Sequence, residues 1–287
     1  MKNIKNEILV IGSVVRDVTI LPSGKKKEAL GGTGTNIAFG LGVLGLYPYL
    51  VSVVGNDFNK KFQNFLNKNG IVLKLIRNNA GKMAAFSVKI SKDERELWDW
   101  QANVANEIEK IKLSSIFKLH DLKNIKIVIF SPGTHKSVLK HMKEFNNQKS
   151  KNAILIFDPG QTIDTYTKKE FLECSKLANI LILNEMEFNK AEKIIKKGLL
   201  KLFKNKIIIK TLGEKGSEIY NKGRMIYVPI IKAKKTVSTV GAGDAYRSGL
   251  IYGLLNNMSL EDSCKLGTKF SSRSVGKVGC HKSFFKI

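Results

Sequence analysis

The sequence predicts an α/β fold in which a doubly wound, mostly parallel sheet carries a small β lid, and three observations lead to this prediction. Six short apolar, β-rich runs recur along the 287 residues, and amphipathic stretches of helical period separate them. These runs are nearly continuous in apolar residues, as expected of strands that are covered on both faces. Residues 14–30 and 82–100 break this rhythm, because they lack a helical period and carry turn and charge punctuation. We expect these two segments to form a small accessory sheet.

The expected elements alternate between strand and helix along the chain. Strands are predicted at residues 8–11, 50–54, 126–130, 154–157, 180–183 and 207–210. Helices are predicted at residues 35–46, 58–69, 137–147, 168–176, 186–197, 244–256 and 260–275. Capping boxes mark two of the helix starts, Thr167 with Glu170 and Ser259 with Asp262. Because no repeat or linker divides the chain, we expect a single domain over residues 1–287 with the lid segments inserted in it.

The chain is strongly basic, with 49 Lys and Arg residues against 24 Asp and Glu and a formal net charge of +25. Its 43% of hydrophobic residues argues against a wholly disordered chain. Such a charge attracts polyanions, but the lysines are spread over the whole chain and no basic stripe is interleaved with aromatic residues. A nucleic-acid partner is therefore not favoured, whereas a small anionic substrate such as a nucleotide would benefit from the charge.

Neither a membrane anchor nor a metal-binding cysteine cluster is indicated by the sequence. No apolar run approaches the roughly 18 residues that a membrane-spanning helix needs, and the N-terminal residues lead directly into a strand without a signal pattern. Cys174, Cys264 and Cys280 are scattered and lack metal-ligand spacing. We therefore expect a reduced protein of the cytoplasm that does not interact with membranes.

The most informative motif is Gly241-Ala242-Gly243-Asp244, which stands at the start of a predicted helix. Its small residues expose backbone N–H groups, and the helix dipole adds to their attraction for an anion. Asp244 is placed to accept a hydroxyl proton while that oxygen attacks a phosphorus atom. An isolated Asp at a helix start would more simply offset the dipole, but the glycine-rich turn favours the catalytic interpretation.

A second glycine-rich turn, Gly31-Gly32-Thr-Gly-Thr-Asn36, leads into the first long helix. The amide of Asn36 could hydrogen-bond sugar hydroxyls, and the alternative is that Asn36 only caps the helix. Glycines within that helix also match the spacing G-x-G-x-x-G, but they do not follow a strand, so we reject a dinucleotide site. The Walker pattern G-x-x-x-x-G-K-[ST] does not occur in the sequence, which excludes a Walker-type nucleotidase.

Two further motifs directly follow predicted strands. In the first, Asn184 and Glu187 present an amide and a carboxylate three residues apart, which can hold the water shell of Mg²⁺. The alternative is a helix N-cap followed by an acid in the first turn. In the second, Thr211, Gly213 and Gly216 are candidates for contact with a nucleotide phosphate, although a plain hairpin turn explains the glycines equally well.

In their order along the chain, these motifs resemble those of the ribokinase-like (PfkB) family of sugar and nucleoside kinases, and the resemblance covers essentially all 287 residues. It rests on Gly12-x-x-x-x-Asp17, Gly31-Gly32…Asn36, Val54-Gly-Asn-Asp57, Asn184…Glu187, Thr211-Leu-Gly213…Gly216 and Gly241-Ala-Gly-Asp244. The last of these is highly specific, and the others are moderately so. Residues 157–161 and 244–249 look most like the bacterial and archaeal branch that contains adenosine and other nucleoside kinases.

The resemblance implies an ATP- and Mg²⁺-dependent transfer of the γ-phosphoryl group to a sugar hydroxyl, usually a primary one. It implies that Asp244 is the base and that the turn Gly241, Ala242 and Gly243 is the anion hole. The implied binding residues are Asp17, Gly32 and Asn36 for the sugar, Asn184, Thr211, Gly213 and Gly216 for the nucleotide, and Glu187 for the metal. The accessory sheet would close over the sugar as a lid, and pairing through this lid would give a homodimer.

One departure from the family pattern and two alternatives remain. The family usually has Asp-Thr before the Gly-Ala-Gly-Asp turn, and Ser238-Thr239 stands there in this chain. In many members that region contributes to a monovalent-cation site, so the sequence leaves potassium activation open. The alternatives are a non-catalytic sugar- or nucleotide-binding protein, which would not need Asp244, and a basic polyanion-binding protein. The sequence does not identify the acceptor.

Overall fold

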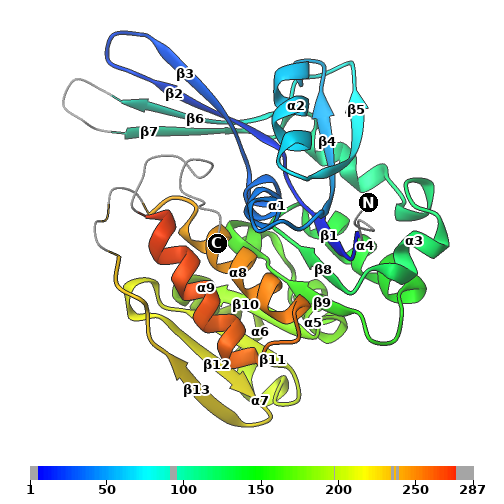
Figure 1. Cartoon of the computed structure of the whole chain (residues 1–287), viewed down its shortest axis with the longest axis vertical. Helices are drawn as coiled ribbons and strands as arrows, with labels where there is room; N and C mark the ends of the chain where they lie inside the picture. Colours follow the sequence, from blue (N-terminus) through cyan, green and yellow to red (C-terminus); the bar gives the residue numbers. More distant parts are fainter. Residues whose placement is uncertain (1–5, 91–95, 197, 234–235, 237–238, 276–287) are drawn as a thin grey trace.

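The computed structural model describes residues 6–90, 96–196, 198–233, 236 and 239–275, and its largest element is a nine-stranded sheet (Figure 1). The strands are Ile8–Ile11 (β1), Tyr49–Gly55 (β4), Val72–Asn78 (β5), Ile127–Phe130 (β8), Ile154–Phe157 (β9), Ile180–Asn184 (β10), Ile207–Thr211 (β11), Ser217–Asn221 (β12) and Arg224–Val228 (β13). Their order across the sheet is β13-β12-β11-β10-β9-β8-β1-β4-β5. The strands from β11 to β5 run parallel, whereas β12 and β13 pair antiparallel at one edge.

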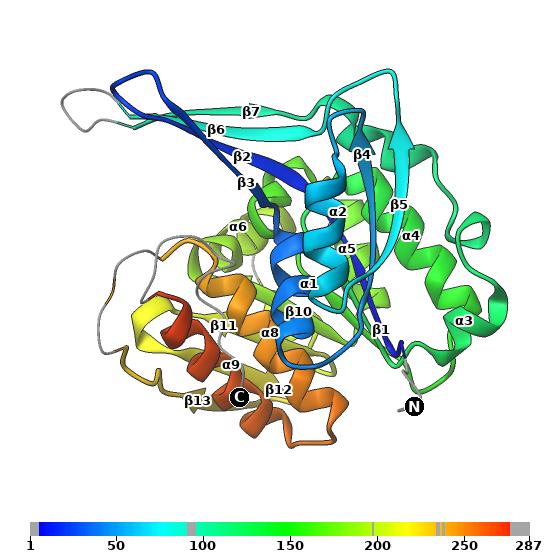
Figure 2. The ribbon, with the colours of Figure 1, turned by 45° about the horizontal axis from the view of Figure 1, so that its top comes forward.

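Helices cover both faces of this sheet, which confirms the predicted fold class (Figures 1 and 2). One face carries Thr33–Val43 (α1), Lys60–Lys68 (α2), Ala242–Leu255 (α8) and Leu260–Ser274 (α9). The other carries Leu119–Asn124 (α3), His135–Gln148 (α4), Lys168–Leu177 (α5), Glu185–Ile195 (α6) and Leu199–Leu202 (α7). Short 3-10 turns lie at Asn103–Lys110 (η1), Leu113–Ser115 (η2), Gly160–Thr165 (η3) and Gly213–Lys215 (η4).

The central strands divide their side chains between two hydrophobic cores. In β1, Leu9 and Ile11 belong to the core under α4, α5 and α6, whereas Ile8 and Val10 belong to the core under α1 and α8. All four side chains are buried. Because successive residues of a strand point to opposite faces, a continuous apolar run is what a strand between two helix layers requires.

A second sheet, in the order β3-β2-β6-β7, projects from the large sheet as a separate layer (Figure 2). Its strands are Val15–Ile20 (β2), Lys26–Gly31 (β3), Ala84–Ile90 (β6) and Glu96–Gln101 (β7), and we call it the lid sheet. Asp57, which follows β4, ties the base of this sheet to the large one. Its Oδ1 accepts a hydrogen bond from the N–H of Met83 at 2.7 Å, and its Oδ2 lies 3.3 Å from Nη1 of Arg16.

Sequence patterning did not predict three strands at the edges of the large sheet, β5, β12 and β13. In β5, Lys74 and Arg77 interrupt the apolar run, because a strand at the sheet edge is only partly covered. Strands β12 and β13 form a hairpin, and its turn is made by Lys222 at φ 50° and Gly223 at φ 78°. Both residues lie in the left-handed region that tight hairpins require.

The predicted helix boundaries shift by a few residues for local reasons. The helix predicted at 35–46 begins at Thr33, because Gly32 already provides the N-cap. The helix predicted at 186–197 ends at Ile195, since Lys196 takes a left-handed conformation with φ 63°. Thr167 and Glu170 form the expected capping box. Ser259 caps its helix through the N–H of Asp262 at 3.0 Å, but its hydroxyl, and not its N–H, donates to the Asp262 carboxylate.

Candidate active site

The glycine-rich turn before α8 has the geometry of a helix start. Gly241 is the N-cap with φ 83°, a conformation that strains any residue with a Cβ, and the helix begins at Ala242. Asp244 therefore lies in the first turn, and its side chain is partly accessible to solvent. The N–H of Ala242 donates to the Thr239 carbonyl at 3.1 Å, so this donor is engaged within the turn itself.

Asn36 and Asp244 meet directly, although they belong to different helices. The Asn36 Nδ2 donates a hydrogen bond to Oδ2 of Asp244 at 2.8 Å. Asn36 lies inside α1, and its own N–H donates to the carbonyl of Gly32 at 2.9 Å. The alternative that Asn36 is the N-cap is therefore wrong, because Gly32 occupies that position with φ 93°. A Cβ on Gly32 would lie 2.6 Å from the Ser13 carbonyl, so this turn requires glycine.

Asp17 approaches the same place from the lid sheet. It lies on β2, and its carboxylate fills the space beside Gly31 on the neighbouring strand β3. A Cβ built on Gly31 would stand only 2.0 Å from Oδ2 of Asp17. The first glycine of the Gly31-Gly32 motif thus makes room for the carboxylate of Asp17.

The carboxylates of Asp17 and Asp244 interact electrostatically. Burial raises the pKa of Asp244 from 3.8 to about 6, with Asp158 adding to the rise, while Arg247 and the hydrogen bond from Asn36 oppose it. Burial also raises the pKa of Asp17 to about 6, and the Asp244 carboxylate contributes to that rise. Acids whose ionised forms are destabilised by burial and by a neighbouring carboxylate are typical of sites where proton affinity is used.

Two residues that sequence reasoning did not select, Arg247 and Asp158, form a buried ion pair next to Asp244. Arg247 Nε lies 2.5 Å from Oδ2 of Asp158, and its Nη2 donates to Oδ1 at 2.7 Å. Arg247 is 7% exposed and Asp158 is 1% exposed. Two sequence signals could have found them: an arginine within a stripe of small and apolar residues, and an acid directly after a fully apolar strand.

Asn184 and Glu187 form a reciprocal capping box at the start of α6. The N–H of Glu187 donates to Oδ1 of Asn184, and the N–H of Asn184 donates to Oε2 of Glu187, each at 2.8 Å. Glu187 is buried, and its burial together with the Asp158 carboxylate raises its pKa. In the described part of the chain, no three His, Cys, Asp or Glu side chains gather as they would for a metal held by protein ligands alone.

The motif at the end of β11 forms a tight turn. Thr211 ends the strand, and Gly213, with φ 60°, begins η4 and has nothing within 4 Å of the position that a Cβ would take. Gly216 has φ 98°, and a Cβ there would lie 2.2 Å from the Val228 carbonyl, so hairpin geometry alone requires this glycine. Ser238 lies outside the described residues.

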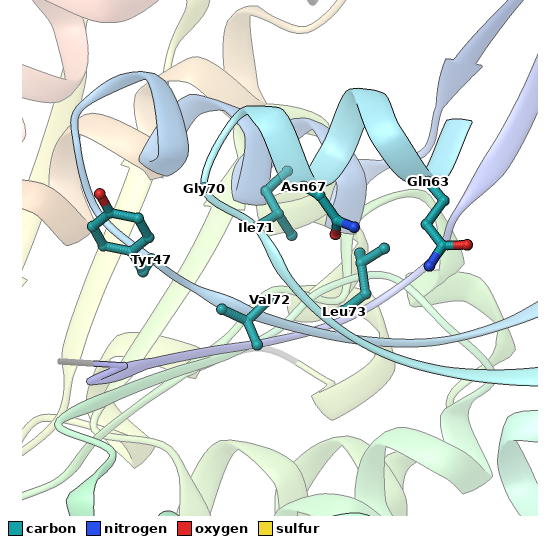
Figure 3. A pocket seen from close by; sticks show the side chains of 7 residues that line it. All are labelled: Tyr47, Gln63, Asn67, Gly70, Ile71, Val72 and Leu73. Atoms are coloured by element: carbon teal, nitrogen blue, oxygen red, sulfur yellow. The ribbon is translucent and has the colours of Figure 1, made fainter. Parts of the chain in front are cut away.

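Other features lie outside this group of residues. A pocket between the end of α2 and the start of β5 is lined by none of the site residues (Figure 3); its lining comprises Tyr47, Gln63, Asn67, Gly70, Ile71, Val72 and Leu73. Cys174 and Cys264 are buried free thiols, and Cys280 lies outside the described residues. Among the helices that the structure describes, none has the length and apolar character needed to cross a bilayer.

Comparison with known proteins identifies the family. The model of the pfkB family of carbohydrate kinases matches residues 5–286, and the chain belongs to this family. The chain is 29% identical over 263 residues to a nucleoside kinase of Methanocaldococcus jannaschii, which covers 91% of this chain and 83% of that protein. The crystal structure of the nucleoside kinase of this archaeon has a TM-score of 0.88 at 26% identity, covering 98% of this chain and 95% of that one. A ribokinase of Thermotoga maritima has a TM-score of 0.81 at 22% identity, covering 96% and 95%.

Family and fold together define the class of enzyme. The protein is a sugar or nucleoside kinase of the ribokinase-like type that depends on ATP. The site geometry fits this class, because three polar side chains from distant parts of the chain, Asp17, Asn36 and Asp244, converge where the lid sheet meets the start of α8.

Proposed function

We propose that the enzyme transfers the γ-phosphoryl group of ATP to a hydroxyl, most simply a primary one, of a nucleoside, and that Asp244 is the base. The observation that carries this proposal is the Asp244 carboxylate, which sits in the first turn of α8 and is oriented by Asn36 at 2.8 Å. In the reaction the acceptor hydroxyl gives its proton to Asp244, and its oxygen forms a bond to the γ-phosphorus. The bond from that phosphorus to the bridging oxygen breaks, and ADP leaves with the electron pair.

The anion hole belongs to the turn Gly241-Ala242-Gly243. The positive end of the α8 dipole and the N–H groups of the first turn favour negative charge at this place. Because Ala242 already donates to Thr239, the remaining donors of the first turn carry this role. Charge that develops on the transferred phosphoryl group would then be stabilised by dipoles that are fixed before the reaction.

Three residues are assigned to the sugar. Asp17 and Asn36 offer hydrogen-bonding groups on either side of the acceptor, and the Gly32 turn brings the backbone close to it. The Oδ1 of Asn36 is buried and has no hydrogen-bond partner among the described residues. A sugar hydroxyl that donates to this oxygen would satisfy it, which is a common reason for an unpaired polar atom at a functional site.

The lid sheet favours a nucleoside over a bare sugar. Asp17 pairs directly with Phe86 on β6, and Phe86 pairs directly with Trp100 on β7. Residues that face each other across strands have their side chains on the same face, so an aromatic row extends from the sugar-binding carboxylate. Trp100 is 52% exposed. An aromatic base attached to the sugar would cover this surface, whereas a sugar alone would leave it in water.

The nucleotide and its metal are assigned to the ends of β10 and β11. Asn184, Thr211, Gly213 and Gly216 would lie along the nucleotide, and Glu187 would face Mg²⁺. A single buried carboxylate fits this ion, because Mg²⁺ keeps several waters and is held largely by the substrate phosphates. When bound, the ion would neutralise charge on the phosphates. Glu187 itself would hold and orient the waters around the ion, and a homodimer through the lid stays a prediction.

The test is a panel of nucleosides and free sugars in which ADP release is measured for the natural enzyme and for Asp244→Asn. We expect turnover with at least one nucleoside and a loss of at least about 1,000-fold in kcat for the variant, because the proton acceptor is gone. Glu28→Gln, a charge-neutralising change on exposed strand β3, is the matched control and should retain activity. A natural enzyme that binds nucleosides but releases no ADP would contradict the proposal.

A further inference from the structure

Arg247 is a cation surrounded by acids in the interior of the site. Its guanidinium holds the Asp158 carboxylate with two contacts, at 2.5 and 2.7 Å, and both side chains are almost completely buried. Asp244 precedes Arg247 by three residues on α8, so the two side chains lie on neighbouring positions of one helix face. Glu187 on α6 also interacts electrostatically with Arg247. Arg247 therefore interacts with three acids from different parts of the fold: Asp158 after β9, Asp244 on α8 and Glu187 on α6.

Asp158 is itself fixed by the backbone. It directly follows β9, and its N–H donates to the carbonyl of Phe130 on β8 at 3.0 Å. Pro159 follows, and Gly160 then turns the chain with φ 49°. Because Asp158 is held at the end of a central strand, it gives the guanidinium a rigid anchor that does not depend on α8.

The second glycine of the α8 turn is explained by Arg247. A Cβ on Gly243 would lie 2.8 Å from Nη1 of Arg247, closer than a side chain tolerates. The guanidinium therefore lies directly against the backbone of the first turn, beside the residue that precedes Asp244. The ion pair and the first turn of α8 form one packed unit, and movement of Arg247 would move that turn.

We propose that the Arg247–Asp158 pair positions Asp244: Asp158 anchors the guanidinium, and the guanidinium fixes the first turn of α8 and keeps the Asp244 carboxylate ionised for proton acceptance. This inference rests on the proposed role of Asp244 as the base. It makes Arg247 and Asp158 positioning residues, because they act on the reaction through Asp244. It also gives Gly243 a reason that is independent of phosphate binding.

The charges around Asp244 support this role when they are taken together. Burial and the Asp158 carboxylate at the end of β9 raise the pKa of Asp244, while Arg247 from α8 and Asn36 from α1 lower it, and Asp244 in turn raises the pKa of Asp17 on β2. Arg247 is the positively charged member of this set. Burial alone would lower the pKa of Arg247, but the surrounding carboxylates outweigh burial and leave it above its ordinary value. Arg247 consequently stays charged at every pH at which the enzyme would be assayed.

The experiment is the pH profile of kcat/KM for Arg247→Met and Asp158→Asn, with ADP release as the readout. Removing the positive charge should move the acid limb of the profile upward by about 1 pH unit. Removing the negative charge of Asp158 should move the limb downward, because Arg247 then acts on Asp244 without its counter-charge. Arg247→Lys keeps the positive charge but loses the two contacts of the guanidinium with Asp158. The acid limb of its pH profile should therefore return to the position seen in the natural enzyme, while kcat stays reduced. Arg224→Met, a charge removal on exposed strand β13, should leave the profile unchanged.

Opposite shifts of the acid limb would establish the proposal, whereas equal losses at every pH without a shift would overturn it and leave a purely structural ion pair. If Arg247→Met does not fold, the Asp158→Asn variant tests the proposal alone. This variant keeps the Arg247 cation and the other acids around it. A downward shift then supports the proposal, and an unchanged limb overturns it. Failure of the proposed function is seen separately, as a natural enzyme that does not turn over or an Asp244→Asn variant that remains fully active.

Discussion

Asn36 and Asp244 are 208 positions apart in the sequence, yet the amide of one donates a 2.8 Å hydrogen bond to the carboxylate of the other. The bond joins the first half of α1 to the first turn of α8, and these two helices pack side by side on the same face of the sheet (Figure 1). A hydrogen bond to an ionised group is among the stronger ones in proteins. It therefore orients the carboxylate and stabilises its charged form together.

We predict that Asn36→Leu, which removes the amide but keeps the number of side-chain heavy atoms, lowers kcat/KM by about 10- to 150-fold at neutral pH. The factor corresponds to about 1.5–3 kcal/mol for a hydrogen bond to a charged group. Steady-state kinetics with the best acceptor measure it. Asn67→Leu is the matched control, because Asn67 is exposed on α2, and it should leave kcat/KM within about twofold. Equal kinetics of both variants would remove Asn36 from the site.

Gly31→Ala should separate binding of the acceptor from stability of the fold. The new Cβ would stand 2.0 Å from Oδ2 of Asp17, and the short side chain of Asp17 can yield only by turning its carboxylate away. We expect KM for the acceptor to rise about tenfold or more, with a loss in the free energy of unfolding below about 2 kcal/mol. Kinetics and denaturant unfolding give the two quantities.

The control for this change is Gly24→Ala in the hairpin of the same lid sheet. Gly24 has φ 78° but nothing within 4 Å of its Cβ position, so the substitution adds backbone strain without displacing any side chain. It should lower stability by about 1 kcal/mol and leave KM unchanged. If Gly24→Ala raised KM as much as Gly31→Ala, the effect would come from the lid backbone and not from Asp17.

The sequence predicted the layer order of the fold because a strand that is buried on both faces has a recognisable composition. Runs such as 154–157 and 180–183 are apolar throughout, and only a strand between two helix layers needs that composition. Edge strands are harder to recognise: β13 contains residues with β propensity, but four of its five residues are exposed, so it is not buried as a central strand is. The conformation of β13 depends on its pairing with β12, and this pairing cannot be predicted from the sequence of β13 alone.

The site residues could be predicted where the backbone conformation requires a particular residue type. Gly241 and Gly32 are N-caps with positive φ, and their neighbours in sequence, Asp244 and Asn36, were found through them. The Arg247–Asp158 pair was not found, because no local pattern relates two residues that are 89 positions apart. Each residue has a local signal of its own, an arginine among small and apolar residues and an acid directly after an apolar strand, but neither signal identifies the partner.

Asp244→Asn should stabilise the protein at the same time as it abolishes activity. The pKa of Asp244 in the folded protein, about 6, lies above its value of about 3.8 in an unfolded chain. Between these values the folded state binds more protons than the unfolded state, so the free energy of unfolding falls as the pH rises through this window. The unfavourable contribution is therefore fully present above about pH 6 and absent below about pH 4.

We expect the variant to gain about 1–3 kcal/mol in the free energy of unfolding at pH 8 and nothing at pH 4. Urea unfolding at both pH values measures the difference. Asp17→Asn should behave in the same way, since its pKa is raised to a similar value. Glu28→Gln on exposed strand β3 is the control and should leave the free energy of unfolding at pH 8 nearly unchanged. A destabilised Asp244→Asn variant at pH 8 would contradict the assigned electrostatics.

Trp100→Ala should discriminate nucleosides from free sugars as acceptors. Trp100 lies in the row that begins at Asp17 and passes through Phe86, and loss of an aromatic surface that stacks on a base costs about 1–3 kcal/mol. We expect KM for a nucleoside to rise about 5- to 150-fold, with little change for ribose. Both tryptophans of the chain lie on β7, so nucleoside binding should also change the intrinsic fluorescence of the natural enzyme.

Asp99→Ala is the control, because alternation along β7 places Asp99 on the opposite face. Equal KM changes for nucleoside and ribose would show that the row acts on the sugar or on the lid as a whole, and not on a base.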